Sequence, residues 1–522
     1  MKIAIAQRNF TVGDLEGNKS KIIENIRQAR EQGAELVVFA EYAISGTPCY
    51  DLLREAPFLE ACEETLREIA THCNNISIVV GLPIQEHNRV MSGAAFIQNG
   101  VIKKYIGKSN VYSRSEKTFI WHAKGTEFVT IGNTKVAIIL GDDLHIERAF
   151  GEFADLVISV ASDPFARGQI EHRYDWCRSI SFTVCKPVVY VNHMGGQSDF
   201  VYDGSSFVMD DHGRPLAVLK SFEEDFAVVD MENAPVVEIP KQDRTRNAFN
   251  AIKLGLRDFF DKNGFTKACL GMSGGIDSAV VLAMAAEVLD PKNIKVLMLP
   301  SRFSSEHSVD DSIEMAEKLG VDYEIISIEP AYDTVIKSLG PVFEGTRFNV
   351  AEENIQSRLR CVMLMALSNK HGYILLNTSN KSEAAVGYGT LYGDMSGALG
   401  PIGDMYKVEV YALARYINRE REIIPENIIL KAPSAELRPD QKDSDSLPPY
   451  DIMDAILTRF VEEGNTLEEI IDAGFDDSTV RRIVEMIKHA EFKRRQAPPP
   501  LRLSQRPFAS DCILPLLNKF IL

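Results

Sequence analysis

The 522-residue sequence predicts two consecutive α/β domains. Three observations favour this fold class. Short apolar runs alternate with helix-like segments over residues 1–231, as in layered α/β folds. A polar segment with two prolines, 232–246, then interrupts the pattern and is expected to be a linker. A new α/β unit begins at Asn247 and is expected to extend to residue 522.

The first domain contains apolar runs that are expected to be strands, at 2–6, 35–39, 77–81, 94–98, 135–140, 156–160, 187–191, 206–209 and 226–229. Helices fit at 18–32 and 58–73. In the second domain, strands are expected up to residue 270, at 296–300 and at 372–376, and a helix-rich region covers 450–493.

Composition and charge exclude several classes of protein. Apolar residues make up 45% of the chain and charged residues 25%, as in globular proteins, and no apolar run is long enough for a membrane span. The net charge of −17 argues against nucleic acid as a partner. Met1 and Lys2 lead directly into an apolar strand, so no signal peptide is expected. The eight cysteines lack regular spacing and are expected to be reduced thiols in the cytoplasm.

The second domain opens with a strand, a loop of small residues and a helix over residues 268–285. Gly271, Gly274 and Gly275 allow the backbone to approach an anion closely. The free N–H groups and the dipole at the start of the following helix favour negative charge. No Gly-Lys-Ser/Thr follows, so the loop differs from the usual ATPase P-loop. The pattern predicts a phosphate-binding loop; the alternative is a helix cap without a ligand.

The run Ser273-Gly-Gly-Ile-Asp-Ser278 resembles the PP-loop of enzymes that split ATP between its α- and β-phosphates. This resemblance implies an adenine-nucleotide α-hydrolase-like, doubly wound parallel sheet. Further motifs extend it to the NAD synthetases, at 377–383, 387–394, 404–407, 431–437, 441–450 and 493–498. The resemblance implies that the nicotinate carboxylate of deamido-NAD attacks the α-phosphate of ATP and releases pyrophosphate. Ammonia then displaces AMP and leaves the carboxamide of NAD.

The same resemblance implies roles for individual residues. ATP would be bound by Gly271, Met272, Ser273, Gly274, Gly275, Ile276, Asp277, Ser278, Thr378 and Lys407. Deamido-NAD would be bound by Asn354, Glu383 and Lys493. Asp277 and Glu383 are hard oxygen ligands suited to Mg²⁺. Taken singly, each of these residues also has a purely structural interpretation. Asp277 and Glu383 could be ordinary carboxylates at helix N-termini, and Lys407 could be an ordinary solvated lysine.

The first domain resembles the nitrilase-like glutaminase domain, an αββα sandwich, that is fused to many NAD synthetases. That domain uses a Glu-Lys-Cys triad of base, oxyanion-stabilising lysine and nucleophile. Glu41 matches the base and Lys108 matches the lysine. Tyr112 and Ser162 match glutamine-binding positions, and Glu116 stands for a second glutamate of the family's loop.

The nucleophile is missing from its position. The family has Cys-Glu-Asp at the end of a strand, whereas the run 135–140 leads here into Gly141-Asp142-Asp143. A glutamine-binding lysine is also absent near Gln169. Cys49 lies after Glu41 but not at the family's position. Glycine has no side chain, so the site cannot form a thioester; whether Gly141 is natural or engineered stays open.

These observations predict an NAD synthetase with a degenerate glutaminase domain, using ATP, deamido-NAD and free ammonia, with glutamine a doubtful donor. One alternative is a conventional glutamine-hydrolysing enzyme whose nucleophile lies elsewhere. The other is a catalytically silent binding or assembly module, which the complete phosphate loop argues against. The resemblance also implies a homo-oligomer without fixing its size.

Overall fold

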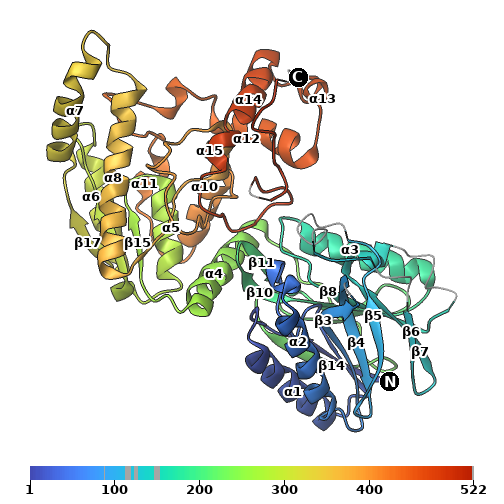
Figure 1. Cartoon of the computed structure of the whole chain (residues 1–522). Helices are drawn as coiled ribbons and strands as arrows, with labels where there is room; N and C mark the ends of the chain where they lie inside the picture. Colours follow the sequence, from blue (N-terminus) through green and yellow to red (C-terminus); the bar gives the residue numbers. More distant parts are fainter. Residues whose placement is uncertain (88, 112–118, 123–126, 146–152, 509, 520–522) are drawn as a thin grey trace. The chain divides into compact units, whose positions relative to one another are not determined.

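The computed structural model describes residues 1–522 except 88, 112–118, 123–126, 146–152, 509 and 520–522. It divides into two compact units, Met1–Gln242 and Asp243–Leu522 (Figure 1). The division lies inside the predicted linker 232–246, because helix α4 (Arg244–Asn263) already begins there. The side chain of Asp243 caps this helix by accepting from the Arg246 N–H at 2.9 Å. The limits of the functional domains stay predictions.

The first unit contains two six-stranded mixed sheets. The first sheet has the order β14 (Asp225–Asp230), β1 (Lys2–Gln7), β2 (Leu36–Phe39), β3 (Ser77–Glu86), β4 (Arg89–Gln98) and β5 (Val101–Gly107). The second has the order β13 (Pro215–Val218), β12 (Phe207–Met209), β9 (Val188–Asn192), β8 (Leu156–Ala161), β7 (Thr134–Leu140) and β6 (Glu127–Ile131). A separate hairpin joins β10 (Met194–Gln197) to β11 (Phe200–Asp203).

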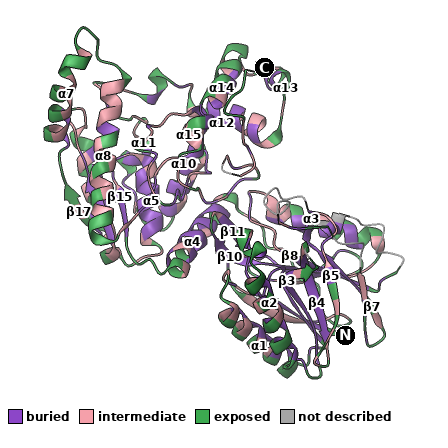
Figure 2. Cartoon of the chain, in the orientation of Figure 1, coloured by how far each residue is buried: buried purple, intermediate pink, exposed green. Residues whose placement is uncertain are grey.

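The two sheets form an αββα sandwich, as the sequence predicts. Alternation along β1 explains the layers: Ile3 and Ile5 face the core between the sheets, whereas Ala4 and Ala6 face the helices. Helices α1 (Leu15–Glu31) and α2 (Ala56–Ala70) pack on the first sheet, and α3 (Gln169–Val184) packs on the second. Figure 2 shows buried strands between helices whose outer sides are exposed.

Several strands of the first unit were not expected from the sequence, namely β5, β6, β10, β11 and β13. Strand β5 shows the physical reason. It lies at a sheet edge, and its first five residues alternate between exposed and partly buried, so it has no continuous apolar run.

The second unit is built on a parallel sheet with the order β17 (Asp322–Ile325), β16 (Ile294–Met298), β15 (Ala268–Gly271) and β18 (Ile374–Leu375). It has the predicted doubly wound PP-loop fold. Its further helices are α5 (Ile276–Ala286), α6 (Glu306–Leu319), α7 (Glu329–Phe343), α8 (Val350–His371), α9 (Lys381–Val386), α10 (Lys407–Ile417), α11 (Glu426–Leu430), α12 (Tyr450–Leu457), α13 (Leu467–Asp472), α14 (Asp477–His489) and α15 (Glu491–Arg494). Among the helices that the structure describes, none is both long and apolar enough to cross a membrane.

Short turns complete the described elements: the 3₁₀ helices Tyr50–Arg54, Gly141–His145, Pro291–Asn293 and Asp443–Asp445, and the π-helix Thr458–Glu463.

A fully buried lysine anchors the C-terminal segment. The Lys381 ammonium lies 2.9 Å from Asp404 Oδ1 and 2.8 Å from Glu462 Oε1, and it donates to Ser504 Oγ at 2.6 Å. A buried ammonium is tolerated only when it is paired and hydrogen-bonded in this way. The network therefore fixes the start of α9, which carries part of the site described below.

The sandwich core predicts that two valines of the first unit contribute differently to the free energy of unfolding. Val79 is fully buried between the sheets, whereas Val101 on the edge strand is 51% exposed. Val79→Ala is expected to lower the free energy of unfolding by about 2 kcal/mol, from lost burial and a residual cavity. Val101→Ala is the matched control and should change it by less than about 0.5 kcal/mol. Denaturant unfolding measures both; equal losses would contradict the sandwich assignment.

Candidate active site

The phosphate loop lies between β15 and α5, at the carboxyl end of a central strand. Gly274 adopts φ +74°, and a Cβ there would lie 2.5 Å from the Ser308 carbonyl oxygen. Only glycine fits, because both the backbone conformation and the close approach exclude a side chain. Gly275 is the N-cap of α5, so the first N–H groups of that helix border the pocket.

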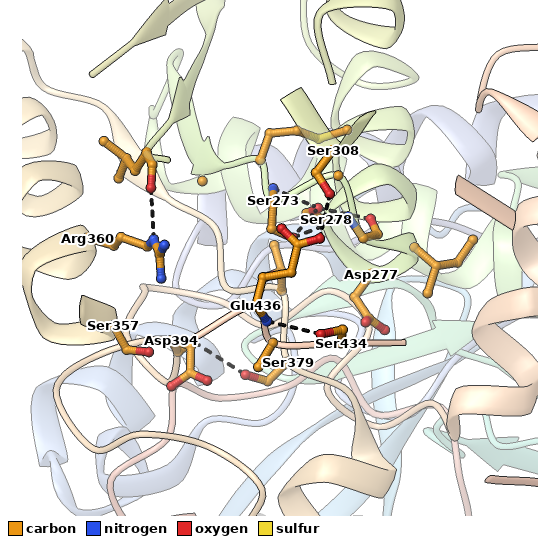
Figure 3. A pocket seen from close by; sticks show the side chains of 18 of the residues that line it. Ser273, Asp277, Ser278, Ser308, Ser357, Arg360, Ser379, Asp394, Ser434 and Glu436 are labelled. Carbon is orange, nitrogen blue, oxygen red and sulfur yellow. Dashed lines mark hydrogen bonds between the residues drawn. The ribbon is translucent and has the colours of Figure 1, made fainter. Parts of the chain in front are cut away.

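A pocket of about 280 Å³ opens over this loop. Figure 3 shows side chains from the loop, from α8 and from the segments after β18 and α11 converging on it. The predicted ATP-binding residues all line it: the whole run Gly271–Ser278, Thr378 and Lys407. Glu383, predicted for deamido-NAD and metal, lines it too.

Lys407 is the electrostatic centre of the pocket. Its Nζ lies 2.5 Å from Asp277 Oδ2 and 3.3 Å from Glu383 Oε1, and its side chain is only 3% exposed. Burial alone would lower the pKa of Lys407, but the two carboxylates outweigh it and raise the pKa above its ordinary value. The expectation of a solvated lysine is therefore wrong.

The two carboxylates are held from separate helices. Asp277 lies in the first turn of α5 and accepts from Asn380 Nδ2 at 2.9 Å. Glu383 forms a capping box with Asn380 at the start of α9. Both are thus helix N-terminal carboxylates as well as pocket residues. Burial raises the pKa of Glu383, opposed by Lys407. The two carboxylates lie close enough to contact the same ammonium group, that of Lys407. As hard oxygen donors, they would also fit Mg²⁺, with phosphate oxygens as further ligands.

Asn354 and Lys493 do not line this pocket among its described residues. Asn354 Oδ1 accepts from Thr390 Oγ1 at 2.8 Å. Lys493 Nζ donates to the carbonyls of Gly387 and Gly389 at 2.7 and 2.8 Å. Both therefore hold the segment 387–394. Part of that segment, with Glu383, lines an adjoining pocket of about 90 Å³.

The structure adds pocket residues to which the sequence assigned no role. Among them are Arg360, Lys431, Ser434, Glu436 and Asp443. Asp443 accepts from the hydroxyls of Tyr388 and Tyr450 at 3.1 and 2.9 Å. Lys431, Ser434, Glu436 and Asp443 fall in the motifs 431–437 and 441–450, which were the available signal for these four residues.

The first unit brings Glu41, Lys108 and Ser162 together. The Lys108 Nζ lies 3.3 Å from Glu41 Oε1, and Ser162 Oγ donates to Glu41 Oε2 at 2.8 Å. Ser92 also donates to Glu41. Glu41 and Lys108 are buried, at the ends of segments that leave β2 and β5. Tyr112 and Glu116 lie outside the described residues.

Gly141 lies at the third corner of this cluster, directly after β7. A Cβ at residue 141 would lie 3.2 Å from Lys108 Nζ and 3.4 Å from Glu41 Oε2. A side chain here would thus point at the base and the lysine, although φ is +40°. Cys49 lies elsewhere: its Sγ bonds to the Gly46 carbonyl at 3.0 Å, and burial raises its pKa to about 12.

Comparisons with known proteins cover both units of the chain. A family model described as NAD synthase matches residues 248–497, and one described as carbon-nitrogen hydrolase matches residues 2–136. The glutamine-dependent NAD(+) synthetase of Synechocystis sp. is 37% identical over 551 residues, covering 99% of each chain. That of Thermotoga maritima is 35% identical over 569 residues, covering 100% of this chain and 99% of its own.

Solved structures extend the comparison to the fold. The glutamine-dependent NAD+ synthetase from Acinetobacter baumannii, in complex with ADP, has a TM-score of 0.78 at 31% identity and covers 98% of this chain and 97% of its own. A glutamine-dependent NAD(+) synthetase from Cytophaga hutchinsonii has a TM-score of 0.87 at 20% identity, covering 99% and 98%, and shows the fold. Since similarity runs over the whole length of both domains, this chain belongs to the family of glutamine-dependent NAD synthetases, which are carbon–nitrogen ligases.

Proposed function

We propose that this chain amidates deamido-NAD to NAD with ATP, and that free ammonia supplies the nitrogen. The observation that carries the choice of nitrogen source is Gly141, which lies beside Glu41 and Lys108 where a nucleophile would be needed. Without a side chain at that corner, the first domain has no group there to attack the amide of glutamine.

The ligase chemistry rests on the pocket of the second domain. An oxygen of the nicotinate carboxylate attacks the α-phosphorus, and the bond from that phosphorus to the bridging oxygen of pyrophosphate breaks. The loop Gly271–Ser278 binds the leaving pyrophosphate through backbone N–H groups, and Thr378 contacts the nucleotide. Lys407 adds positive charge beside the loop. A Mg²⁺ held by Asp277 and Glu383 would neutralise phosphate charge there.

The second half-reaction forms the amide. Ammonia attacks the acyl carbon of the adenylated intermediate, the carbon–oxygen bond to AMP breaks, and the attacking nitrogen loses a proton. Asn354 and Lys493 support deamido-NAD indirectly in this proposal, by holding the backbone of the segment 387–394. Glu383 faces both pockets, so it can serve both the metal and the substrate.

The alternative nitrogen donor is glutamine. The relatives are named as glutamine-dependent enzymes. In this chain it would require another nucleophile. Burial raises the pKa of Cys49, Cys62 and Cys73 to about 12, which disfavours a reactive thiolate. Glu41 already accepts from Ser92, Ser162 and Lys108, so the cluster is satisfied without a substrate.

The metal and phosphate assignment predicts the effect of removing either carboxylate. Asp277→Ala and Glu383→Ala should each lower the turnover of NAD formation by at least about a hundredfold, through lost stabilisation of the leaving pyrophosphate. Glu287→Ala, at the other end of α5 and paired with Lys253, is the control and should retain activity. Near-normal turnover by either active-site variant would contradict the assignment.

The first domain predicts an absence of glutaminase activity. The full-length protein, incubated with glutamine, deamido-NAD and ATP, should release no glutamate above the background of a sample without enzyme. Ammonium in the same assay should support AMP release. Glutamate formed in a one-to-one ratio with NAD would restore the conventional glutamine-hydrolysing enzyme.

Restoring the nucleophile should restore activity only in part. In Gly141→Cys, the new Cβ lies 3.2 Å from Lys108 Nζ, so the lysine must shift, and φ +40° opposes a side chain. The substrate carboxylate would also lack the lysine that is missing near Gln169, at a cost of about 1.5–3 kcal/mol. Gly141→Cys/Gln169→Lys should therefore release glutamate faster than Gly141→Cys. Equal rates for the single and double variants would show that the missing lysine is irrelevant.

A further inference from the structure

Arg360 is a guanidinium on the wall of the ATP pocket with one hydrogen bond. Its Nε donates to the Leu299 carbonyl at 2.9 Å, and it lines the same pocket as Ser357 and Asp394 (Figure 3). Within the described part of the chain, its two terminal nitrogens have neither a hydrogen-bond acceptor nor a carboxylate at ion-pair distance. The bond from Nε fixes the side chain and leaves the fork of the guanidinium for a ligand.

Two other buried arginines of this protein are paired with carboxylates. Arg173 donates to Asp203 at 2.5 Å, and Arg494 lies 3.0 Å from Glu491. Arg360 is affected by Glu436 and Asp394 only from a longer distance, and burial lowers the pKa of its guanidinium. A desolvated cation without a partner is costly, so an anionic ligand would stabilise it.

The position of Arg360 in the pocket indicates which part of the nucleotide it would contact. Arg360 lies one turn before Leu364 on α8, and Leu364 Cδ1 would be 3.2 Å from a Cβ at Gly271, the first residue of the loop. Arg360 is thus near the start of the loop, whereas Lys407 contacts Asp277 at the start of α5. Apolar residues that suit an adenine ring also line the pocket, from the strand ends and from α8: Leu297, Leu299, Leu364 and Leu375.

We propose that Arg360 binds the α-phosphate, through its two terminal nitrogens, in ATP and in the adenylated intermediate. This inference rests on the proposed function, in which the loop and Lys407 serve the pyrophosphate. A guanidinium presents two parallel N–H donors that match two oxygens of one phosphate. The α-phosphate is also the group that stays in the pocket after pyrophosphate leaves, and it then has only the cations outside the loop to stabilise it.

The contact would act through the whole reaction. When the carboxylate oxygen bonds to the α-phosphorus and the pyrophosphate bond breaks, negative charge grows on the two non-bridging oxygens. Donors fixed beforehand stabilise that charge without reorganising. When ammonia later displaces AMP, the α-phosphate leaves with AMP, so AMP itself should bind through Arg360.

The test compares the binding of AMP and adenosine to the full-length protein by calorimetry, because the two ligands differ only in the α-phosphate. The wild type should bind AMP at least about tenfold more tightly than adenosine. Arg360→Met should lose this difference while binding adenosine normally, and Arg360→Lys should recover part of it. Lys370→Met, at the exposed end of the same helix, is the matched control and should keep the full difference.

Each outcome decides the proposal. An unchanged preference for AMP in Arg360→Met, or an equal loss of AMP and adenosine binding, would overturn it, the latter by showing a structural role. If the Met variant does not fold by circular dichroism, Arg360→Lys carries the test: its preference for AMP must lie below that of the wild type, and an undiminished preference overturns the proposal. The measurement needs no turnover, so a protein that prefers AMP through Arg360 yet makes no NAD would contradict the proposed function alone.

Discussion

The buried lysine of the second domain is the interaction on which the rest of the ATP site depends. Lys407 begins α10 and contacts Asp277 of α5 and Glu383 of α9, so one ammonium joins three helices. Without it, two carboxylates would face each other in a largely buried place, which is strongly unfavourable. The phosphate loop and the candidate metal ligands therefore share one electrostatic support. The same positive charge that holds these walls together also favours an anion in the pocket.

The first domain also contains a buried ion pair, Glu41 and Lys108, but this pair does not border the ATP pocket. Glu41 and Lys108 are satisfied by each other and by Ser92 and Ser162. Breaking such a pair costs about 3–5 kcal/mol, because the remaining charge is left buried without a partner. Both residues are thus needed by the fold, whether or not the first domain hydrolyses glutamine. Their presence is no evidence for hydrolysis.

How far the sequence could predict the structure depended on how local the signal was. The phosphate loop was predictable because Gly271, Gly274 and Gly275 act through their own backbone and the helix that follows. Strand β5 was missed because an exposed edge strand lacks an apolar run.

Roles that depend on distant parts of the chain were less accessible. Lys407 and Asp277 are 130 residues apart, and only the fold makes them partners. Asn354 and Lys493 contact the segment 387–394 instead of lining the ATP pocket, which no spacing in the sequence indicates. Arg360 was missed for the same reason, since its importance lies in having no carboxylate of the described residues at ion-pair distance.

The central claim is that the first domain contributes structure and the second takes ammonia directly. The most direct measurement is the mass of NAD formed by the wild-type protein in a mixture of glutamine labelled with ¹⁵N in its amide and unlabelled ammonium. The account predicts that NAD carries no excess ¹⁵N at any ratio of the two donors. NAD labelled in proportion to the glutamine supplied would contradict it.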